Sequence, residues 1–348
     1  MSSKINKAQN ASIVAFPKNG IAYNEALYKS LESRGVKVKE GLFTGRWLLK
    51  NLEKHDCVHL HWPSFFYATK KGKRSELVSF LKFCLFLFYI KIKCRSIYWT
   101  AHNLYPHNPA SIPCLDVLAR WLVIALCTKI FVHGKTAAQT LMNEFPLVKS
   151  KLELIDHGNW IDYYPNTITR EKARARFKIE EGKFVYLFIG LCSRYKNVHI
   201  LVEAFSHLPD NSILLIAGKF QDQDYYEKVT KEIAKITDKK IHLEACFIPD
   251  DQLQYFLLAS DVVVLPYAES LTSGAAVLAL GFGRPVIAPK LGYLTDIIND
   301  ENGILYCPNE TEKLIAAMKK FQNSEFSEDE IFKYAQSLSW DSACEALI

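Results

Sequence analysis

The chain has 348 residues, 49% of them hydrophobic and 23% charged, which excludes a disordered or fibrous protein and suits two globular domains. Its nine cysteines are an odd number without a Cys-x-x-Cys pair, which argues against a disulfide framework and favours the reducing cytosol. Residues 1–150 contain 22 Lys or Arg and 8 Asp or Glu, a net charge of +14, within a total of +6; this asymmetry indicates an anionic partner for the first half, either nucleic acid or a membrane surface.

Short apolar runs rich in β-branched residues alternate with helical stretches along the whole chain. In the first half they predict strands over 12–16, 57–62, 96–100, 129–132 and 152–155, with a helix over 23–33. A polar break and a charged helix over 170–181 follow. In the second half the predicted strands cover 184–190, 212–218, 261–266, 285–288 and 303–306.

Strands that alternate with helices predict parallel sheets covered on both faces. We therefore expect an α/β protein with two Rossmann-like domains, residues 1–165 and 166–336, that face each other across a cleft. Residues 1–10 lack the apolar core of a signal peptide, and no segment is apolar for long enough to span a bilayer. The sequence thus predicts a cytoplasmic protein.

A basic and apolar segment lies between the second and third predicted strands. Residues 70–74 are rich in Lys and Arg, the apolar run over 77–90 contains Lys82, and Lys91, Lys93 and Arg95 follow. A helix of this kind suits the interface of an anionic membrane leaflet. The alternative is a buried helix, and both interpretations hold if one face is core and the other meets a membrane. We favour peripheral contact with the inner face of the plasma membrane.

The strongest functional pattern runs over 261–288. A strand is followed by a polar turn with Glu269, and then Thr272, Ser273 and Gly274 begin a helix of small residues. Backbone N–H groups at a helix start bind phosphate, glycine lets the ligand approach, and the hydroxyls add donors. Glu269 would repel phosphate, so its expected partner is a hydroxyl such as that of a sugar. The alternative is that Thr272, Ser273 and Gly274 form only a helix N-cap and that Glu269 is a solvated loop residue.

A second pattern follows the first strand of the second half. Gly190 ends that strand, and Arg194 and Lys196 lie on the loop after it. Two cations at a strand end can neutralise a diphosphate leaving group without a metal. The alternative is a solvated basic loop.

Histidines end strands in the first half. His59 and His61 offer only two nitrogens, whereas zinc takes three or four protein ligands, so we expect no metal site. His102 could hydrogen-bond a sugar or take a proton from an acceptor hydroxyl, because the pKa of histidine lies near neutrality. His59 is expected in the core. Gly20, after the first strand, is expected to line the acceptor side.

The second half resembles the C-terminal domain of family 4-like GT-B glycosyltransferases. The resemblance covers most of 183–320, in the glycine-ended strand, Lys196, and the strings at 203–205, 216–218, 259–266, 283–288 and 302–306. Residues 338–341 look like the family's closing helix, which implies that 337–348 packs back on the first domain.

The resemblance implies that 166–336 is the nucleotide-sugar-binding domain, with Gly190, Arg194, Lys196, Thr272, Ser273 and Gly274 binding the donor. Glu269 matches the first acid of the family's motif of two glutamates. The second acid, which holds the ribose in the family, falls at Val277 or Leu278, and both are apolar. Ribose recognition must therefore differ in this chain.

The strings at 61–63 and 99–103 are similar to those of bacterial exopolysaccharide glycosyltransferases, including xanthan-type β-mannosyltransferases. By this resemblance His102 is an active-site residue together with Glu269, and Gly20, His61 and His157 lie on the acceptor side. His157 and Gly158 resemble the family's hinge turn.

We thus expect a metal-independent hexosyltransferase. It would move a hexose, with mannose from GDP-mannose favoured, from a nucleotide sugar to a lipid-linked oligosaccharide in surface polysaccharide synthesis, with no cofactor beyond that co-substrate. The missing second glutamate supports an alternative, a non-catalytic nucleotide- or membrane-binding GT-B module. A nucleic-acid partner is not expected, because the basic half has no recognition motif.

Overall fold

The computed structural model describes residues 12–69 and 71–348; residues 1–10 and Lys70, used in the predictions above, lie outside the described residues. The chain forms two compact units. The first consists of the residues up to Gly158 together with Ser339–Ile348, and the second of Asn159–Leu338. The sequence predicts this domain boundary a few residues later, between 165 and 166, and predicts that the C-terminal segment packs on the first domain from residue 337. Each unit contains one parallel six-stranded sheet.

The first unit has the strand order β2-β1-β3-β4-β5-β6. Its strands are β1 (Ser12–Phe16), β2 (Lys37–Glu40), β3 (Cys57–Leu60), β4 (Ser96–Thr100), β5 (Lys129–Val132) and β6 (Leu152–Leu154). The helices are α2 (Ala22–Ser33), α3 (Gly45–Asn51), α4 (Lys73–Lys93), α5 (Pro113–Leu126), α6 (Lys135–Glu144) and α15 (Trp340–Leu347), with the short 3-10 turns η1 (Pro63–Phe66) and η2 (Pro146–Val148).

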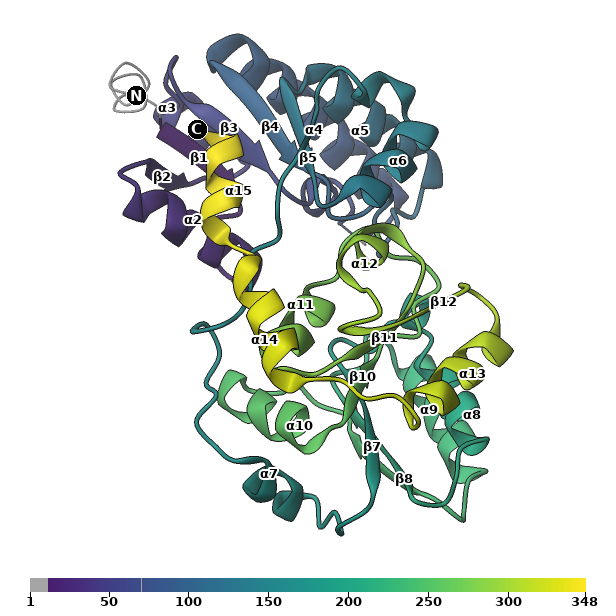
Figure 1. Cartoon of the computed structure of the whole chain (residues 1–348). Helices are drawn as coiled ribbons and strands as arrows, with labels where there is room; N and C mark the ends of the chain where they lie inside the picture. Colours follow the sequence, from purple (N-terminus) through teal and green to yellow (C-terminus); the bar gives the residue numbers. More distant parts are fainter. Residues whose placement is uncertain (1–11, 70) are drawn as a thin grey trace. The chain divides into compact units, whose positions relative to one another are not determined.

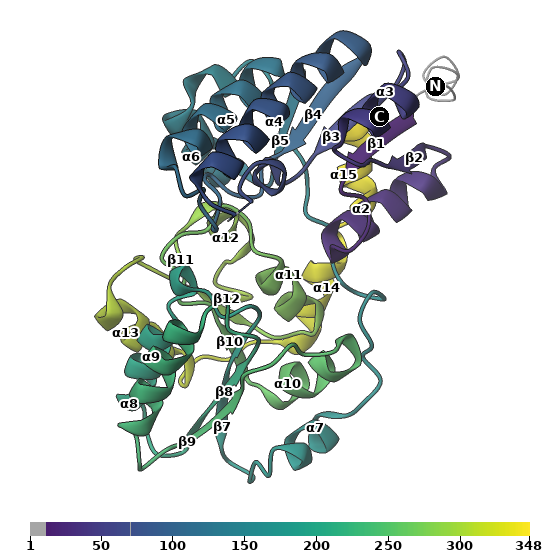
Figure 2. The same ribbon diagram turned by 180° about the vertical axis from the view of Figure 1, so that it is seen from behind.

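The strand order determines which helices cover each face of this sheet. The chain moves in one direction from β1 to β2 and in the other from β3 through β6, and right-handed crossovers then place the connecting helices on opposite faces. Helix α2 accordingly lies on one side and α4 and α5 on the other (Figures 1 and 2). The C-terminal α15 packs against α2, where Ser30 Oγ donates to Asp341 Oδ1 at 3.0 Å.

The second unit has the strand order β12-β11-β10-β7-β8-β9. Its strands are β7 (Phe184–Ile189), β8 (Ser212–Ala217), β9 (Lys240–Glu244), β10 (Val262–Val264), β11 (Val286–Pro289) and β12 (Gly303–Tyr306). Its helices and 3-10 turns are α7 (Arg170–Arg176), η3 (Arg194–Lys196), α8 (Val198–Ser206), α9 (Gln223–Ala234), η4 (Asp250–Gln252), α10 (Leu253–Ala259), α11 (Gly274–Gly281), α12 (Gly292–Ile297), α13 (Thr311–Phe321) and α14 (Glu328–Ser337).

Most predicted strands are confirmed, and four (12–16, 96–100, 129–132 and 303–306) have the predicted bounds. The helix predicted over 170–181 is shorter than expected, because it ends at Arg176 and Lys178 adopts a left-handed φ of 51°. Strands β2 and β9 were not predicted. Both are edge strands with charged residues along their length, so they lack the apolar run of a central strand.

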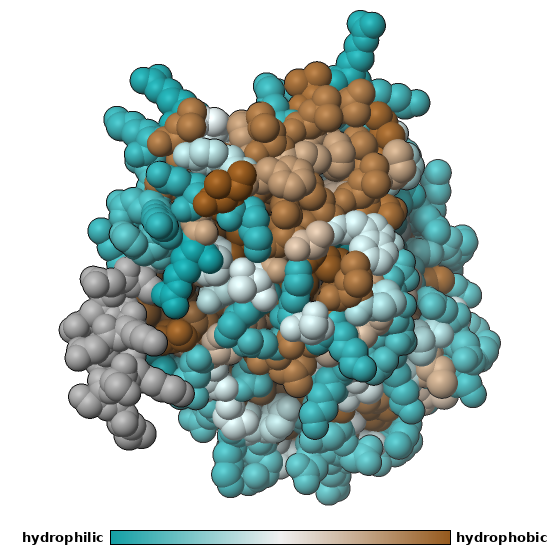
Figure 3. Space-filling model, turned by 90° about the horizontal axis from the view of Figure 1, so that it is seen from above, coloured by the Kyte–Doolittle hydropathy of each residue, from teal (hydrophilic) through white to brown (hydrophobic). Residues whose placement is uncertain are grey.

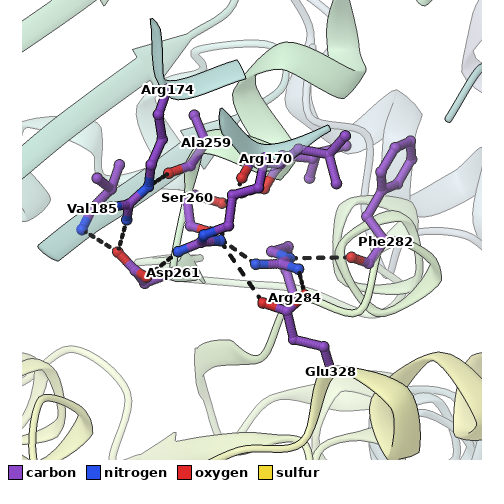
Figure 4. Close-up of polar contacts among 11 residues, drawn as sticks. Arg170, Arg174, Val185, Ala259, Ser260, Asp261, Phe282, Arg284 and Glu328 are labelled. Atoms are coloured by element: carbon purple, nitrogen blue, oxygen red, sulfur yellow. Dashed lines mark hydrogen bonds and ion pairs between the residues drawn. The ribbon is translucent and has the colours of Figure 1, made fainter. Parts of the chain in front are cut away.

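A polar network in the second unit connects α7, the residue before β10 and α14 (Figure 4). Arg170 and Arg174 pair with Asp261, which also accepts a hydrogen bond from the Val185 N–H at 2.7 Å. The buried Arg284 pairs with Glu328 and donates to the Ser260 carbonyl at 3.1 Å. Arg284 belongs to the family-like string at 283–288, so part of that string serves the fold.

Within the described residues, no helix has both the length and the apolar character needed to cross a membrane.

Candidate functional site

A cavity of about 460 Å³ opens in the second unit at the carboxyl ends of its central strands. This is the edge at which open parallel sheets bind their ligands. Its wall consists of Trp160, Tyr164, Ile189, Gly190, Leu191, Lys196, Ala217, Gly218, Lys219, Phe247, Ile248, Asp250, Leu253, Gly274, Ala275 and Leu278. We call it the donor cavity, because the sequence predicts the nucleotide-sugar site in this unit.

Two glycines bring backbone to the floor of the donor cavity. A Cβ at Gly218 would lie 1.9 Å from the carbonyl oxygen of Gly190, and the φ of Gly218 is +156°. Gly190 has a φ of +125°. Because a side chain at 218 would collide with backbone atoms that cannot yield, the ends of β7 and β8 approach each other this closely only with glycine.

Lys196 contributes a positive charge to the wall of the donor cavity. Its Nζ would lie 3.3 Å from a Cβ built on Gly190, and it is 5.3 Å from the ring centroid of Tyr267. Among the described residues, no carboxylate forms an ion pair with it. This ammonium group is therefore available for an anionic ligand, and the end of β7 holds it against the cavity.

Only part of the predicted phosphate-binding turn reaches the cavity. Gly274 lines it, and its carbonyl accepts a hydrogen bond from Trp160 Nε1 at 3.1 Å. Ser273 is buried and caps α11 by accepting the Ala276 N–H at 3.4 Å. Thr272 is not in the wall, and its Oγ1 is buried without a hydrogen-bond partner among the described residues. The structure thus brings together Gly190, Lys196 and Gly274.

Arg194 and Glu269 lie outside the wall of the donor cavity. The Arg194 guanidinium pairs with Asp222 at 2.7 Å, the residue that caps α9. Glu269 is exposed on the loop before α11. Their roles in binding the donor stay predictions.

An apolar side chain stands where the family-like motif would place its second acid. Val277 is fully buried in α11, whereas Leu278 lines the donor cavity. The cavity wall at this position is therefore apolar, and the sequence alone did not show which of the two residues faces the cavity.

In the first unit, four histidines gather around Tyr23. His61, His102, His133 and His157 follow β3, β4, β5 and β6, and their ring centroids lie 4.7–5.9 Å from that of Tyr23. We call these four residues the histidine cluster. Its members meet because the carboxyl ends of neighbouring parallel strands share one edge of the sheet.

Burial keeps these histidines neutral. It lowers the pKa of His133 to about 3 and that of His157 to about 4. For His61 and His102, burial first and then neighbouring histidines hold the pKa well below its usual value. In the adjacent core, burial lowers the pKa of His59 to about 3, which agrees with its predicted core position.

Gly20 does not belong to the histidine cluster. It is exposed in a turn, and its N–H donates to Glu25 Oε1 at 2.8 Å. His157 lies beside Gly158, at which a Cβ would lie 2.1 Å from the ring of Trp340, so the glycine permits α15 to pack there. His133 was missed in the sequence, although it directly follows a strand, as His61 and His102 do.

Within the part of the chain that the structure describes, no three His, Cys, Asp or Glu residues are grouped so as to hold a metal ion.

The comparison with known proteins agrees with this geometry. Residues 169–338 match the family of glycosyl transferases group 1. The chain therefore contains a glycosyl transferase group 1 domain. The matched residues lie within the unit that holds the donor cavity, Asn159–Leu338, and include most of the cavity wall.

Relatives and solved structures extend the likeness to the first unit. Over 269 residues the chain is 25% identical to the GDP-mannose:glycolipid 4-beta-D-mannosyltransferase of Xanthomonas campestris pv. campestris, which covers 76% of this chain and 67% of the relative. The Anabaena protein HepE in complex with UDP-glucose has a TM-score of 0.71 at 16% identity and covers 97% of this chain and 98% of its own. A glycosyltransferase from Rickettsia africae has a TM-score of 0.66 at 14% identity, with coverages of 97% and 96%. The predicted α/β GT-B fold is confirmed.

Proposed function

We propose that this glycosyltransferase moves a hexose, with mannose from GDP-mannose favoured, from a nucleotide sugar to a lipid-linked oligosaccharide in surface polysaccharide synthesis. The observation that supports the proposal is the donor cavity of the group 1 domain, with Lys196 in its wall. Among the described residues, no carboxylate forms an ion pair with the Lys196 ammonium. The name of the Xanthomonas relative supports GDP-mannose and a glycolipid acceptor. The HepE complex supports a nucleotide sugar as donor.

The chemistry follows from the charge of the leaving group. Cleavage of the bond between sugar and diphosphate leaves negative charge on the nucleoside diphosphate, and a fixed cation beside it lowers the barrier. Lys196 and the backbone N–H groups at the start of α11, near Gly274, would bind this diphosphate. They would do so without a metal ion, while Leu278 and Trp160 supply apolar contact for the nucleoside.

A donor panel tests the proposal. The purified chain would be incubated with GDP-, UDP- and dTDP-sugars in the presence of lipid-linked oligosaccharide in anionic vesicles, and released nucleoside diphosphate and glycolipid product would be measured. We expect turnover with GDP-mannose. Turnover with a different nucleotide sugar would replace GDP-mannose as the proposed donor. No turnover with any nucleotide sugar would contradict the proposal.

The apolar Leu278 favours one alternative, a non-catalytic module. Such a module would bind a nucleoside diphosphate in calorimetry but release no glycolipid product in the same panel. The two measurements together separate the two functions.

We further infer that the first unit contacts an anionic membrane surface through α4 and α5. Phe80, Phe83, Leu87 and Ile90 bury one face of α4, and its opposite face exposes Leu77, Val78, Leu81, Leu85, Phe88 and Ile92. On the neighbouring α5, Val117, Leu118 and Trp121 are exposed. Together these exposed residues form what we call the apolar face, and Figure 3 shows a broad apolar area on the molecule seen from above.

The charges around the apolar face are basic. On α4, Lys73, Arg74, Lys82, Lys91 and Lys93 are exposed, whereas its single acid, Glu76, is buried and accepts the Ser111 N–H at 2.7 Å. Apolar side chains with a basic rim match the interface of an anionic leaflet, where each cation contributes about 1 kcal/mol. A lipid-linked acceptor would also be presented at such a surface.

Vesicle flotation of the double variant Leu81→Glu, Phe88→Glu tests this surface. These side chains are 60% and 50% exposed, so the variant should fold, while two carboxylates at the interface oppose insertion and anionic lipid. We expect at least about a tenfold loss of binding to phosphatidylglycerol vesicles. As a control, Ile348→Glu, 60% exposed beyond α15, should bind as the parent does. Equal binding of the parent and the double variant would contradict the inference.

A further inference from the structure

A buried chain of hydrogen bonds leads through the first unit to His102. Thr100 Oγ1 lies 2.8 Å from His59 Nε2, and Tyr28 OH lies 2.9 Å from His59 Nδ1. The same Tyr28 hydroxyl is 2.6 Å from His61 Nε2, and His61 Nδ1 is 3.0 Å from His102 Nε2. All five side chains are buried. Each link needs one hydrogen and one lone pair.

Only two arrangements of hydrogens satisfy every link. A neutral imidazole has one N–H and one acceptor nitrogen, and the Tyr28 hydroxyl has one hydrogen. If Tyr28 donates to His61, then His61 donates from Nδ1 to His102, His59 donates to Tyr28, and Thr100 donates to His59. If Tyr28 donates to His59 instead, every direction reverses, and His59 Nε2 donates to Thr100. The direction of the hydrogen bond between Thr100 and His59 therefore determines the direction of the hydrogen bond between His61 and His102.

Thr100 decides between the two arrangements. Its side chain has 0% exposure, and within the described residues His59 Nε2 is the partner of its hydroxyl. In the reversed arrangement the Thr100 hydrogen would be buried without an acceptor, which carries the desolvation penalty of an unmade hydrogen bond. In the first arrangement every hydrogen of the chain has an acceptor up to His102. His102 Nε2 then accepts from His61, so its own hydrogen must be on Nδ1.

We propose that Thr100, His59, Tyr28 and His61 are positioning residues that hold His102 in the Nδ1–H form, so that His102 donates a hydrogen bond to an oxygen of the saccharide substrate. The ring is held for this role, because Trp62 stacks on it with centroids 4.3 Å apart and Tyr23 meets it edge-on at 4.7 Å. It retains 7% exposure, and within the described residues Nδ1 makes no hydrogen bond.

The neutral state of the ring supports this role. Burial, followed by the charges that His133, His157 and His59 would carry, lowers the pKa of His102 well below its usual value. His102 is therefore an uncharged donor near neutral pH. The proposal rests on the proposed transferase function. Of the two roles considered for His102, it selects hydrogen bonding to the sugar and excludes proton acceptance from the acceptor hydroxyl at Nδ1.

The tautomer can be measured without substrate. Long-range ¹⁵N–¹H NMR spectra of the uniformly labelled full chain near pH 7.5 would show which ring nitrogen of His102 is protonated, with the signal assigned by its loss in His102→Asn. We expect a pyrrole-type Nδ1 and an acceptor-type Nε2. The opposite pattern would overturn the proposal, whether or not the chain transfers a sugar.

Variants at Thr100 test whether the Thr100 hydroxyl determines the tautomer of His102. Thr100→Val keeps the shape of the side chain but removes the hydroxyl, so the preference is lost and the Nε2–H form of His102 should appear. Thr100→Ser keeps the hydroxyl and should keep the parent spectrum. An unchanged tautomer in Thr100→Val would exclude the positioning role. If Thr100→Val does not fold, Tyr28→Phe interrupts the same chain and has the same expected result.

Activity measurements then test the donor role. A residue that donates from Nδ1 can be replaced in part by the amide of His102→Asn, whereas His102→Ala has no donor and should lose on the order of 100-fold in kcat/KM. We expect His102→Asn to stay within about tenfold of the parent. If Asn is as inactive as Ala, His102 acts by accepting a proton and the donor role is wrong.

Discussion

Acidification from pH 6.5 to pH 4.5 is expected to destabilise the first unit by about 2 kcal/mol for each of His59, His133 and His157. Burial lowers the pKa of these residues to about 3, 3 and 4 in the folded chain, while in the unfolded chain they titrate near the ordinary value of about 6.5. Between these pH limits the unfolded state binds more protons than the folded state. The free energy of unfolding therefore falls as the pH falls.

Urea unfolding at pH 7.5, 6.5, 5.5 and 4.5, followed by tryptophan fluorescence and circular dichroism, would measure this effect. Burial also lowers the pKa of His61 and His102, so His133→Gln removes one of five such groups and should flatten the pH dependence by about a fifth of the histidine contribution. His55→Gln, at an exposed residue of the same unit, is the matched control and should leave the slope unchanged. A free energy of unfolding that is constant from pH 7.5 to 4.5 would show that the buried histidines become protonated without cost.

Replacing Lys196 by Ala is expected to lower kcat/KM by about 100- to 1000-fold. The Lys196 ammonium is held at the wall of the donor cavity against Gly190, so its charge acts where the departing diphosphate would gain charge. Because this interaction strengthens in the transition state, kcat should fall more than the affinity for the nucleoside diphosphate. Steady-state kinetics and calorimetry with GDP separate the two effects.

Arg194→Ala is the matched control for this experiment. Arg194 lies on the same 3-10 turn as Lys196, but it is largely exposed and pairs with Asp222. Because Arg194 pairs with Asp222 and lies outside the cavity wall, we now expect no donor-binding role for it, in contrast to the prediction from the sequence. Its loss should change kcat/KM by less than about threefold, since exposed ion pairs contribute little. Equal losses in the two variants would mean that both cations bind the diphosphate. A Lys196→Ala variant with parental kinetics would remove the donor cavity from the mechanism.

The sequence by itself determined the fold class and the position of Lys196 at the end of a central strand. Central strands such as β7 and β8 are buried on both faces, so they must be continuous apolar runs, and such runs are visible without a structure. Lys196 follows one of these strands, and a residue at the carboxyl end of a parallel strand lies at the ligand-binding edge. The edge strand β2 had no comparable signal, because only part of it is buried.

Only the tertiary structure decided which of the predicted side chains act together. Asp222 pairs with Arg194 from the start of another helix, and nothing in local sequence connects them. The apolar segment over 77–90 suited both a core and a membrane; packing of α4 divided it into a buried and an exposed face. The hydrogen-bonded chain from Thr100 to His102 exists because β3 and β4 are neighbours in the sheet and α2 brings Tyr28 over them. Sheet order and helix packing are long-range properties, so they settle contacts that residue patterns along the chain leave open.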